Sequence, residues 1–329
     1  MLEEIERTVR RVVPDILIRH EPPPDGLEPV PVVFDSPHSG RVYPTDFDFA
    51  APFDIMRRAE DAFVDELFAS APLHGAALLA ALFPRSYVDP NRHEHEIDTL
   101  LLNEPWPHPI VPSHRSARGL GVVRRLVRAT VAVYDRRLSV SEVQTRIARY
   151  HRPYHEELSA MIAEAHGRHG IVWHLNCHSM KSTAKGRVRD DFVLGDRDGT
   201  TCAPEFIELV ASSLRRLGYS VGLNHPFKGA EIVTRHGSPA DGRHSLQIEI
   251  NRGLYMDEAR IEKSAGFAGL RDDINGLIAT ISAYARDQVT ARTARPESAL
   301  PDCAPGRTAG SAQSAGPRGP GPPLRRAPP

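Results

Sequence analysis

The sequence predicts an α/β protein in which helices cover both faces of a central β-sheet. Residues 30–34 and 171–176 form short apolar runs that are typical of buried strands. Longer segments with apolar residues at helical spacing separate these runs, most clearly residues 141–166. Strands that alternate with helices favour a sheet that is covered on both sides. The chain of 329 residues is long enough to bury a large core.

The first expected element is a helix over residues 2–13, because its apolar residues recur at helical spacing. The proline-rich segment 21–26 ends it. Pro153 should kink or divide the helix over 141–166, because proline cannot donate the hydrogen bond of a helix interior. The other expected elements are helices over 52–70, 204–217 and about 257–289, and strands near 219–223 and 245–251.

The expected domain organisation has three parts. Residues 1–29 are interpreted as an N-terminal helix and linker, and residues 30–290 as a single domain of catalytic size. Residues 291–329 are predicted to be a disordered tail. From Pro296 onward this tail holds 9 of the 29 prolines and has almost no apolar periodicity, so it lacks the burial needed to offset the entropy of ordering.

The composition excludes several classes of protein. Forty-one Lys and Arg residues against 42 Asp and Glu residues give a net charge of −1, which is unlike a nucleic-acid binder or a polybasic membrane-surface protein. No apolar run approaches the length of a transmembrane helix, and the N-terminus has no apolar core like that of a signal peptide. The three cysteines include no CxxC pair, so no disulfide framework is expected. A cytoplasmic protein with a small-molecule substrate is therefore predicted, and its oligomeric state is left open.

Polar residues follow or interrupt the predicted strands, where ligands bind in open α/β sheets. His38 follows the first strand, His178 follows the second, and Glu249 lies within the strand at 245–251. Two histidines and a carboxylate suit a zinc site that keeps one position for water. The carboxylate ligand would be Asp61 or Asp65, and Glu249 could take a proton from the water. Taken singly, these residues also fit structural histidines and the solvated face of a helix.

A second group of candidates lies in the loop over residues 85–92. Arg85, Asn91 and Arg92 suit recognition of a substrate carboxylate, although an ordinary turn with solvated charges has the same composition. Cys177 lies beside His178, but adjacent strand residues point to opposite faces, so Cys177 is interpreted as a buried apolar residue.

Two further tracts resemble binding motifs. The alternating His and Glu residues at 93–96 fit a polar loop better than a metal site. The glycines at 119–121 lack the third glycine of a dinucleotide-binding loop.

Seven short motifs occur between about residues 30 and 285. They are SPHSG (36–40), DAFVDELF (61–68), VDPNR (88–92), YHRPYH (150–155), NCHSM (176–180), DFVLGD (191–196) and QIEINR (247–252). In this order they resemble the N-formylglutamate amidohydrolases. That family is similar to the zinc carboxypeptidases and the aspartoacylase group, which implies an α/β domain with a mixed sheet and a zinc site at its edge.

The resemblance also implies roles for particular residues. His38, His178 and Asp61 would bind one zinc ion (Zn²⁺) or another divalent metal, with Asp65 as the fallback for Asp61. Arg41 stands three residues after His38, so the His-x-x-Glu pair of the carboxypeptidases is absent.

The remaining roles concern catalysis and the substrate. Glu249 would act as the general base, and Asn91 and Arg92 would bind the α-carboxylate of the substrate. Arg85 would assist them, and Arg187 would bind the side-chain carboxylate.

The function that follows is hydrolysis of the C–N bond of a small N-acyl amino acid. N-formyl-L-glutamate, which would yield formate and L-glutamate in histidine breakdown, is the expected substrate. Two alternatives remain: a metallo-amidase or carboxypeptidase that acts on another N-acyl amino acid or peptide, and a non-catalytic binding module on the same fold.

Overall fold

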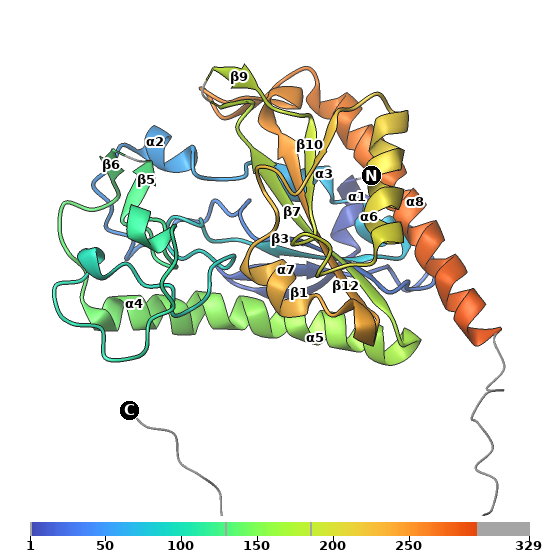
Figure 1. Ribbon diagram of the computed structural model, residues 1–329, viewed down its shortest axis with the longest axis horizontal. Helices are drawn as coiled ribbons and strands as arrows, with labels where there is room; N and C mark the ends of the chain where they lie inside the picture. The colour runs from blue at the N-terminus through green and yellow to red at the C-terminus, as the bar shows by residue number, and fades with distance from the viewer. Residues whose placement is uncertain (1, 129, 185, 295–329) are drawn as a thin grey trace, which may run out of the picture.

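The computed structural model describes residues 2–128, 130–184 and 186–294 (Figure 1). Within these residues, eight strands form one sheet in the order β1-β2-β4-β3-β7-β12-β10-β11. The central strands β4, β3, β7 and β12 are parallel, whereas β2 and β10 pair antiparallel with β4 and β12. The predicted α/β domain with a mixed central sheet is therefore confirmed. The strands are β1 (Val9–Val13), β2 (Leu17–His20), β3 (Val32–Ser36), β4 (Ala77–Ala81), β7 (Val172–Met180), β10 (Phe192–Gly195), β11 (Val221–Leu223) and β12 (Arg243–Asn251).

Helices pack on both faces of this sheet. A long rod formed by α4, a π-helix and α5 lies along one face, and α6 and α8 lie on the other (Figure 1). The rod stays helical across Pro153, the second residue of α5, so the predicted kink or division there is replaced by the π-helix just before it. The helices are α1 (Leu2–Glu6), α2 (Phe53–Arg57), α3 (Val64–Leu67), α4 (Val140–Arg146), the π-helix (Ile147–His151), α5 (Arg152–His169), α6 (Pro204–Arg216), α7 (Glu231–His236) and α8 (Phe267–Thr293).

Short elements join these layers. The small hairpins are β5 (Leu126–Arg128) with β6 (Val131–Ala132), β8 (Thr183–Ala184) with β9 (Arg187–Val188), and β13 (Met256–Asp257) with β14 (Glu262–Lys263). The 3₁₀ turns are Ala71–His74, Thr99–Leu101, Ser116–Arg118, Pro239–Asp241 and Arg252–Leu254.

The alternation of side chains along β7 and β12 decides which residues reach the site. The apolar residues of both strands enter the core under α6 and α8, namely Trp173, Leu175, Cys177, Leu246, Ile248 and Ile250. Because neighbouring strand residues point to opposite faces, His178 and Glu249 project toward the α5 side. Cys177 is fully buried, as predicted.

The N-terminal region differs from the prediction. Only Leu2–Glu6 is helical, and Val9–Val13 is a strand that pairs with β2 at the edge of the sheet. Valines at positions 9, 12 and 13 favour an extended chain, and the sheet edge supplies the hydrogen bonds. Residues 1–29 are therefore not simply a helix and linker, because β1 and β2 belong to the main sheet.

Two predicted helices are shorter than expected. The segment 52–70 contains α2 and α3, with a turn between them in which Phe63 has a φ of 65°. The predicted helix at 257–289 begins only at Phe267, because residues 256–263 form the β13–β14 hairpin. The predicted tail lies outside the described residues from position 295 onward, and residues 291–293 end α8.

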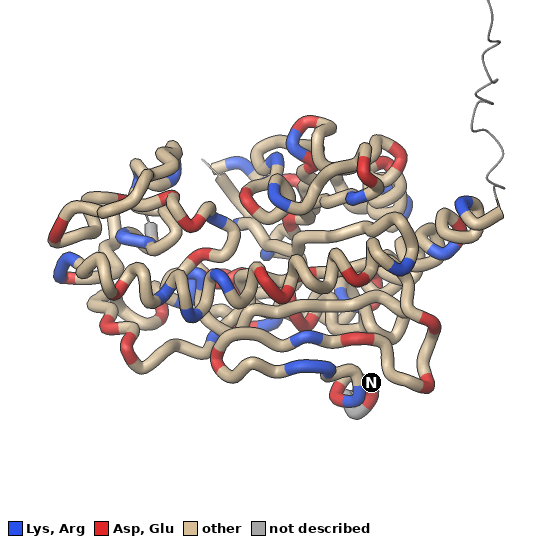
Figure 2. The backbone as a smooth tube through the Cα atoms, turned by 90° about the horizontal axis from the view of Figure 1, so that it is seen from below, with Lys and Arg blue, Asp and Glu red and all other residues tan. Residues whose placement is uncertain are grey.

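The described part of the chain has no helix that is long and apolar enough to cross a membrane. Figure 2 shows that basic and acidic residues are interspersed along this side of the molecule, which agrees with the near-neutral net charge.

Candidate active site

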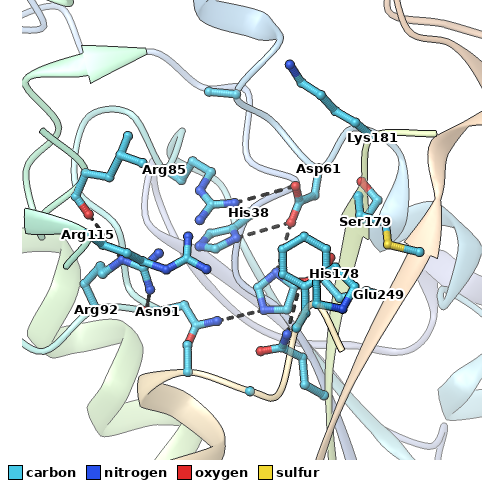
Figure 3. Close-up of a pocket in the computed structure, with 18 of the residues that line it drawn as sticks. His38, Asp61, Arg85, Asn91, Arg92, Arg115, His178, Ser179, Lys181 and Glu249 are labelled. Carbon is cyan, nitrogen blue, oxygen red and sulfur yellow. Dashed lines mark hydrogen bonds and ion pairs between the residues drawn. The ribbon is translucent and has the colours of Figure 1, made fainter. Parts of the chain in front are cut away.

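Three residues from separate elements meet at the carboxyl end of the central strands. His38 lies just after β3, His178 lies near the end of β7, and Asp61 lies in the turn between α2 and α3 (Figure 3). The chain after His38 passes very close to the next loop, since a Cβ atom on Gly40 would lie 2.2 Å from the carbonyl oxygen of Phe83. Glycine is therefore required there, and it fixes the turn that carries His38.

Asp61 stands between the two imidazole rings. Its Oδ2 atom lies 2.9 Å from Nδ1 of His178 and 3.2 Å from Nδ1 of His38. All three side chains are buried. In the described residues they form the one group of His, Cys, Asp or Glu side chains that could hold a metal ion, with candidate ligand atoms within 4.8 Å of one another.

Contacts on the far side of each ring hold its orientation. Nε2 of His38 is 2.7 Å from Oδ1 of Asp89. Nε2 of His178 is 2.7 Å from Oδ1 of Asn176. The Asn176 amide is oriented because its Nδ2 donates to Asp35 at 2.8 Å, and Nε2 of His178 also lies 2.9 Å from Nδ2 of Asn91.

Both Nδ1 atoms face the Asp61 carboxylate. Arg252 donates to Oδ1 of Asp61 at 3.0 Å, which leaves Oδ2 to face the two rings. A metal ion bound here would replace any proton between these atoms, because metal ligands must be deprotonated. Two imidazoles oriented by a carboxylate and an amide, together with one carboxylate, make a donor set that fits a divalent metal.

The alternative ligand Asp65 lies outside this group. It is on α3, where its backbone N–H donates to Oγ of Ser39 at 3.1 Å, and burial raises the pKa of its carboxyl to about 6. A helix over 52–70 would have placed Asp61 and Asp65 on one face, but the turn before α3 directs Asp61 alone toward the histidines.

Glu249 lies directly beside His178, because β12 pairs with β7 in a parallel register that matches these two residues. Gln247 donates from Nε2 to Oε1 of Glu249 at 3.0 Å. Burial is the main cause that raises the pKa of Glu249, and the nearby Asp61 carboxylate adds to it. A buried carboxylate whose pKa is raised is a suitable proton acceptor.

Three of the four predicted substrate-binding residues, Arg85, Asn91 and Arg92, line the same cavity. Nη2 of Arg85 donates to Oδ2 of Asp89 at 2.9 Å. Arg85 and Arg92 lie on the same side of the histidines (Figure 3). Arg92 donates to the backbone carbonyl of Asn91 at 2.7 Å. The Asn91 side chain accepts from the Ile232 N–H at 3.0 Å, and its Nδ2 lies 2.9 Å from His178. Asn91 therefore connects the loop over residues 85–92 to the group formed by His38, Asp61 and His178.

Two histidines of the YHRPYH motif support this loop from below. Nε2 of His151 lies 2.9 Å from the carbonyl oxygen of Arg92, and Nε2 of His155 lies 2.8 Å from that of Pro90. The π-helix ends at His151 and continues into α5, where His155 lies one turn further on. The motif therefore positions the loop that carries Asn91 and Arg92.

The cavity above these residues has a volume of about 730 Å³ and is strongly cationic. Eleven of its described lining residues are Lys or Arg, whereas only Asp61 and Glu249 are acidic. Arg187 lies on the exposed hairpin strand β9 and is not among the described residues that line the cavity. A dianionic ligand would be attracted to this cavity.

Sequence reasoning missed several residues that the structure brings to the site. Asp89 and Arg252 lie within the VDPNR and QIEINR motifs, next to residues that were already candidates. The sequence therefore did contain a signal for them. Asn176 precedes His178 by two residues, and strand alternation places both on one face. Asp35 and Arg124 had no comparable signal.

Comparison with known proteins agrees with these motifs. The family model described as N-formylglutamate amidohydrolase matches residues 30–256. This chain belongs to the N-formylglutamate amidohydrolase family. The resemblance predicted from the sequence is therefore confirmed.

Two relatives are similar over most of the chain, and a third is similar over a shorter part of it. The crystal structure of N-formylglutamate amidohydrolase from Ralstonia eutropha JMP134 has 44% sequence identity and a TM-score of 0.80, and the match covers 83% of this chain and 99% of that one. N-formylglutamate deformylase from Pseudomonas aeruginosa is 28% identical over 273 residues, which are 79% of this chain and 95% of that protein. The deformylase from Pseudomonas putida is 33% identical over 112 residues, which are 32% of this chain and 42% of that protein.

Proposed function

We propose that the protein is a metal-dependent amidohydrolase that cleaves N-formyl-L-glutamate into formate and L-glutamate. The observation that carries this proposal is the convergence of three candidate ligand atoms, from His38, Asp61 and His178, at the base of a cationic cavity. The similar proteins from Ralstonia eutropha and Pseudomonas aeruginosa, which are named for N-formylglutamate, support the choice of substrate.

The donor set favours zinc, since two imidazoles and one carboxylate are usual ligands of a catalytic zinc ion. His38, Asp61 and His178 would hold one ion per chain, and cobalt or manganese suits the same donors. When bound, the metal supplies Lewis-acid chemistry, because it polarises a carbonyl group and makes water more acidic.

The chain's own residues bind the substrate and move protons. Glu249 accepts a proton from the attacking water and returns it to the leaving nitrogen as the C–N bond breaks. Asn91 and Arg92 bind the α-carboxylate. Arg85, whose Nη1 lies 3.7 Å from Oδ1 of Asp61, stabilises negative charge that develops in the same site.

Removal of the metal tests the proposal directly. Purified protein that is loaded with zinc should release formate from N-formyl-L-glutamate. Dialysis against a chelator should abolish this release and lower the thermal unfolding midpoint, because a ligand that binds only the folded state stabilises it. Metal content by mass spectrometry and an enzymatic formate assay measure both effects, and zinc should restore them. Full activity in protein that is free of metal would contradict the proposal.

Replacement of Cys177 by alanine separates this mechanism from a thiol hydrolase. Cys177 is fully buried on the opposite face of β7 from His178, and burial raises the pKa of its thiol well above the usual range. We expect Cys177→Ala to cost about 1 kcal/mol of stability and to leave kcat close to the wild-type value. Iodoacetamide should not label Cys177 in the folded protein. Loss of formate release in a folded Cys177→Ala protein would restore the thiol hypothesis.

A further inference from the structure

Arg124 is a buried arginine on the wall of the cavity that the sequence analysis assigned to no function. Its residue is 7% exposed, and it lines the cavity together with Arg85 and Arg92. It ends the segment GLGVVR (119–124), which follows neither of the phosphate-binding patterns that contain such glycines.

Backbone contacts join this segment to the loop that carries Arg92. The Asp89 N–H donates to the carbonyl of Val122 at 2.7 Å, and Nε of Arg92 donates to that of Leu120 at 3.3 Å. Gly121 permits this close approach, because a Cβ atom there would lie 2.4 Å from the carbonyl oxygen of Glu96. Arg92 and Arg124 are therefore held on one wall of the cavity.

The positive charge on this wall exceeds the negative charge that the described residues offer it. Oδ2 of Asp89 accepts from Nη2 of Arg124 at 3.2 Å and from Nη2 of Arg85 at 2.9 Å. Oδ1 of the same carboxylate already faces His38 and the Asn91 N–H. Asp89 thus serves two guanidinium groups. Arg85 also lies 3.7 Å from Oδ1 of Asp61, whereas Asp89 is the one carboxylate in the described residues that pairs with Arg124.

The Arg124 side chain gives further evidence of this excess of positive charge. Its Nε atom is buried and has no hydrogen-bond partner among the residues that the structure describes. Burial is the main cause that lowers the pKa of Arg124 to about 9, and the neighbouring Arg85 charge adds to it. A buried cation in this state is stabilised by any anion that enters the cavity.

We propose that Arg124 binds the side-chain carboxylate of a dicarboxylic N-acyl amino acid and so selects acidic substrates over neutral ones. The proposal rests on the function proposed above, in which Asn91 and Arg92 bind the α-carboxylate. A substrate with two carboxylates supplies the second negative charge that this wall lacks. Arg187, which the sequence predicted for this role, lies on the exposed hairpin instead.

Two substrates of nearly equal size test this assignment. N-formyl-L-glutamate and N-formyl-L-glutamine differ only in the charge of the side-chain group. The ratio of kcat/KM between them should fall at least about tenfold in Arg124→Met, because charge-assisted hydrogen bonds to the carboxylate are lost. Arg124→Lys, which keeps the charge without the planar fork, should fall between Arg124→Met and wild type.

Arg125→Met is the matched control. Arg125 adjoins Arg124 but pairs with Asp98 at 2.7 Å and is not among the described residues of the cavity wall. It should keep the wild-type ratio, and thermal unfolding should show that all three variants are folded. If Arg124→Met lowers kcat/KM equally for both substrates, or leaves the ratio unchanged, the assignment is wrong.

Binding of the product amino acid separates this inference from the proposed reaction. If zinc-loaded wild type releases no formate from either substrate, the reaction has failed and calorimetry with L-glutamate and L-glutamine still tests Arg124. A preference for L-glutamate that disappears in Arg124→Met would support the assignment. Equal binding of L-glutamate and L-glutamine to wild type would overturn it.

Discussion

Replacing His178 with alanine should remove both the bound metal and the hydrolytic activity. His178 supplies one of three converging candidate ligand atoms, and its Nδ1 lies 2.9 Å from Asp61. Without it, two donors remain, which is fewer than the three protein ligands of typical catalytic zinc sites. Loss of a residue that orients a metal ligand typically lowers metal affinity or activity roughly 10- to 100-fold. We expect formate release to fall by more than this in His178→Ala.

Asn176→Ala provides the graded comparison. Asn176 only orients His178 through a hydrogen bond to Nε2, so its loss should weaken zinc affinity without removing a ligand. Zinc content by mass spectrometry should therefore decrease in the order wild type, Asn176→Ala, His178→Ala.

His244→Ala is the control for loss of a buried histidine. His244 lies near the start of β12, at the end far from Glu249. Its ring stacks on the ring of Trp173 with a centroid distance of 5.8 Å. This variant should retain zinc and activity. Stoichiometric zinc together with wild-type formate release in His178→Ala would show that His178 is a structural residue.

The sequence was sufficient to predict β3, β7 and β12 and most of the residues that meet at the candidate site, because local and tertiary preferences agree there. β7 and β12 are apolar on one face and are buried in the middle of the sheet. The rule that ligands bind at the carboxyl ends of strands then brought His38, His178 and Glu249 into one hypothesis.

Other parts of the fold depend on contacts that no local pattern reveals. β4 has the sequence ALLAA, which favours a helix, yet it pairs with β2 and β3 inside the sheet. The periodicity over 52–70 gave no indication of the turn that separates Asp61 from Asp65.

The charged residues of the cavity show a related limit. Arg124 and Arg187 are equivalent in sequence, since each is an arginine in an irregular segment. The packing of Gly121 against Glu96 and the hydrogen bond from the Asp89 N–H to Val122 place Arg124 beside Asp89, whereas Arg187 is exposed on a hairpin. Sequence reasoning therefore identified Arg85 and Arg92, which line the cavity, but not Arg124.

Replacing Glu249 with glutamine should separate catalysis from metal binding. The amide has nearly the same shape as the carboxylate but cannot accept the proton of water, so kcat should fall about 10²- to 10⁴-fold. Zinc content should remain at the wild-type level, because His38, Asp61 and His178 are the residues that converge on the ion site. This pattern would differ from that of His178→Ala, in which metal and activity are lost together.

The stability of Glu249→Gln provides a second observable. Because burial raises the pKa of Glu249, the folded state disfavours the ionised side chain at neutral pH. A neutral glutamine avoids this cost, so the thermal midpoint of the metal-free variant should equal or exceed that of the metal-free wild type.

Glu157→Gln is the matched control for these measurements. Glu157 is also buried, but it pairs with Arg11 and Arg19 at the edge of the sheet, away from the cavity. We expect it to lose stability, because Arg11 loses its carboxylate partner and Arg19 keeps only Glu21 and Glu164, and to retain kcat. If Glu249→Gln retained zinc and hydrolysed N-formyl-L-glutamate at the wild-type rate, the proton acceptor would be another residue. The raised pKa of Glu249 would then reflect only its burial beside Asp61.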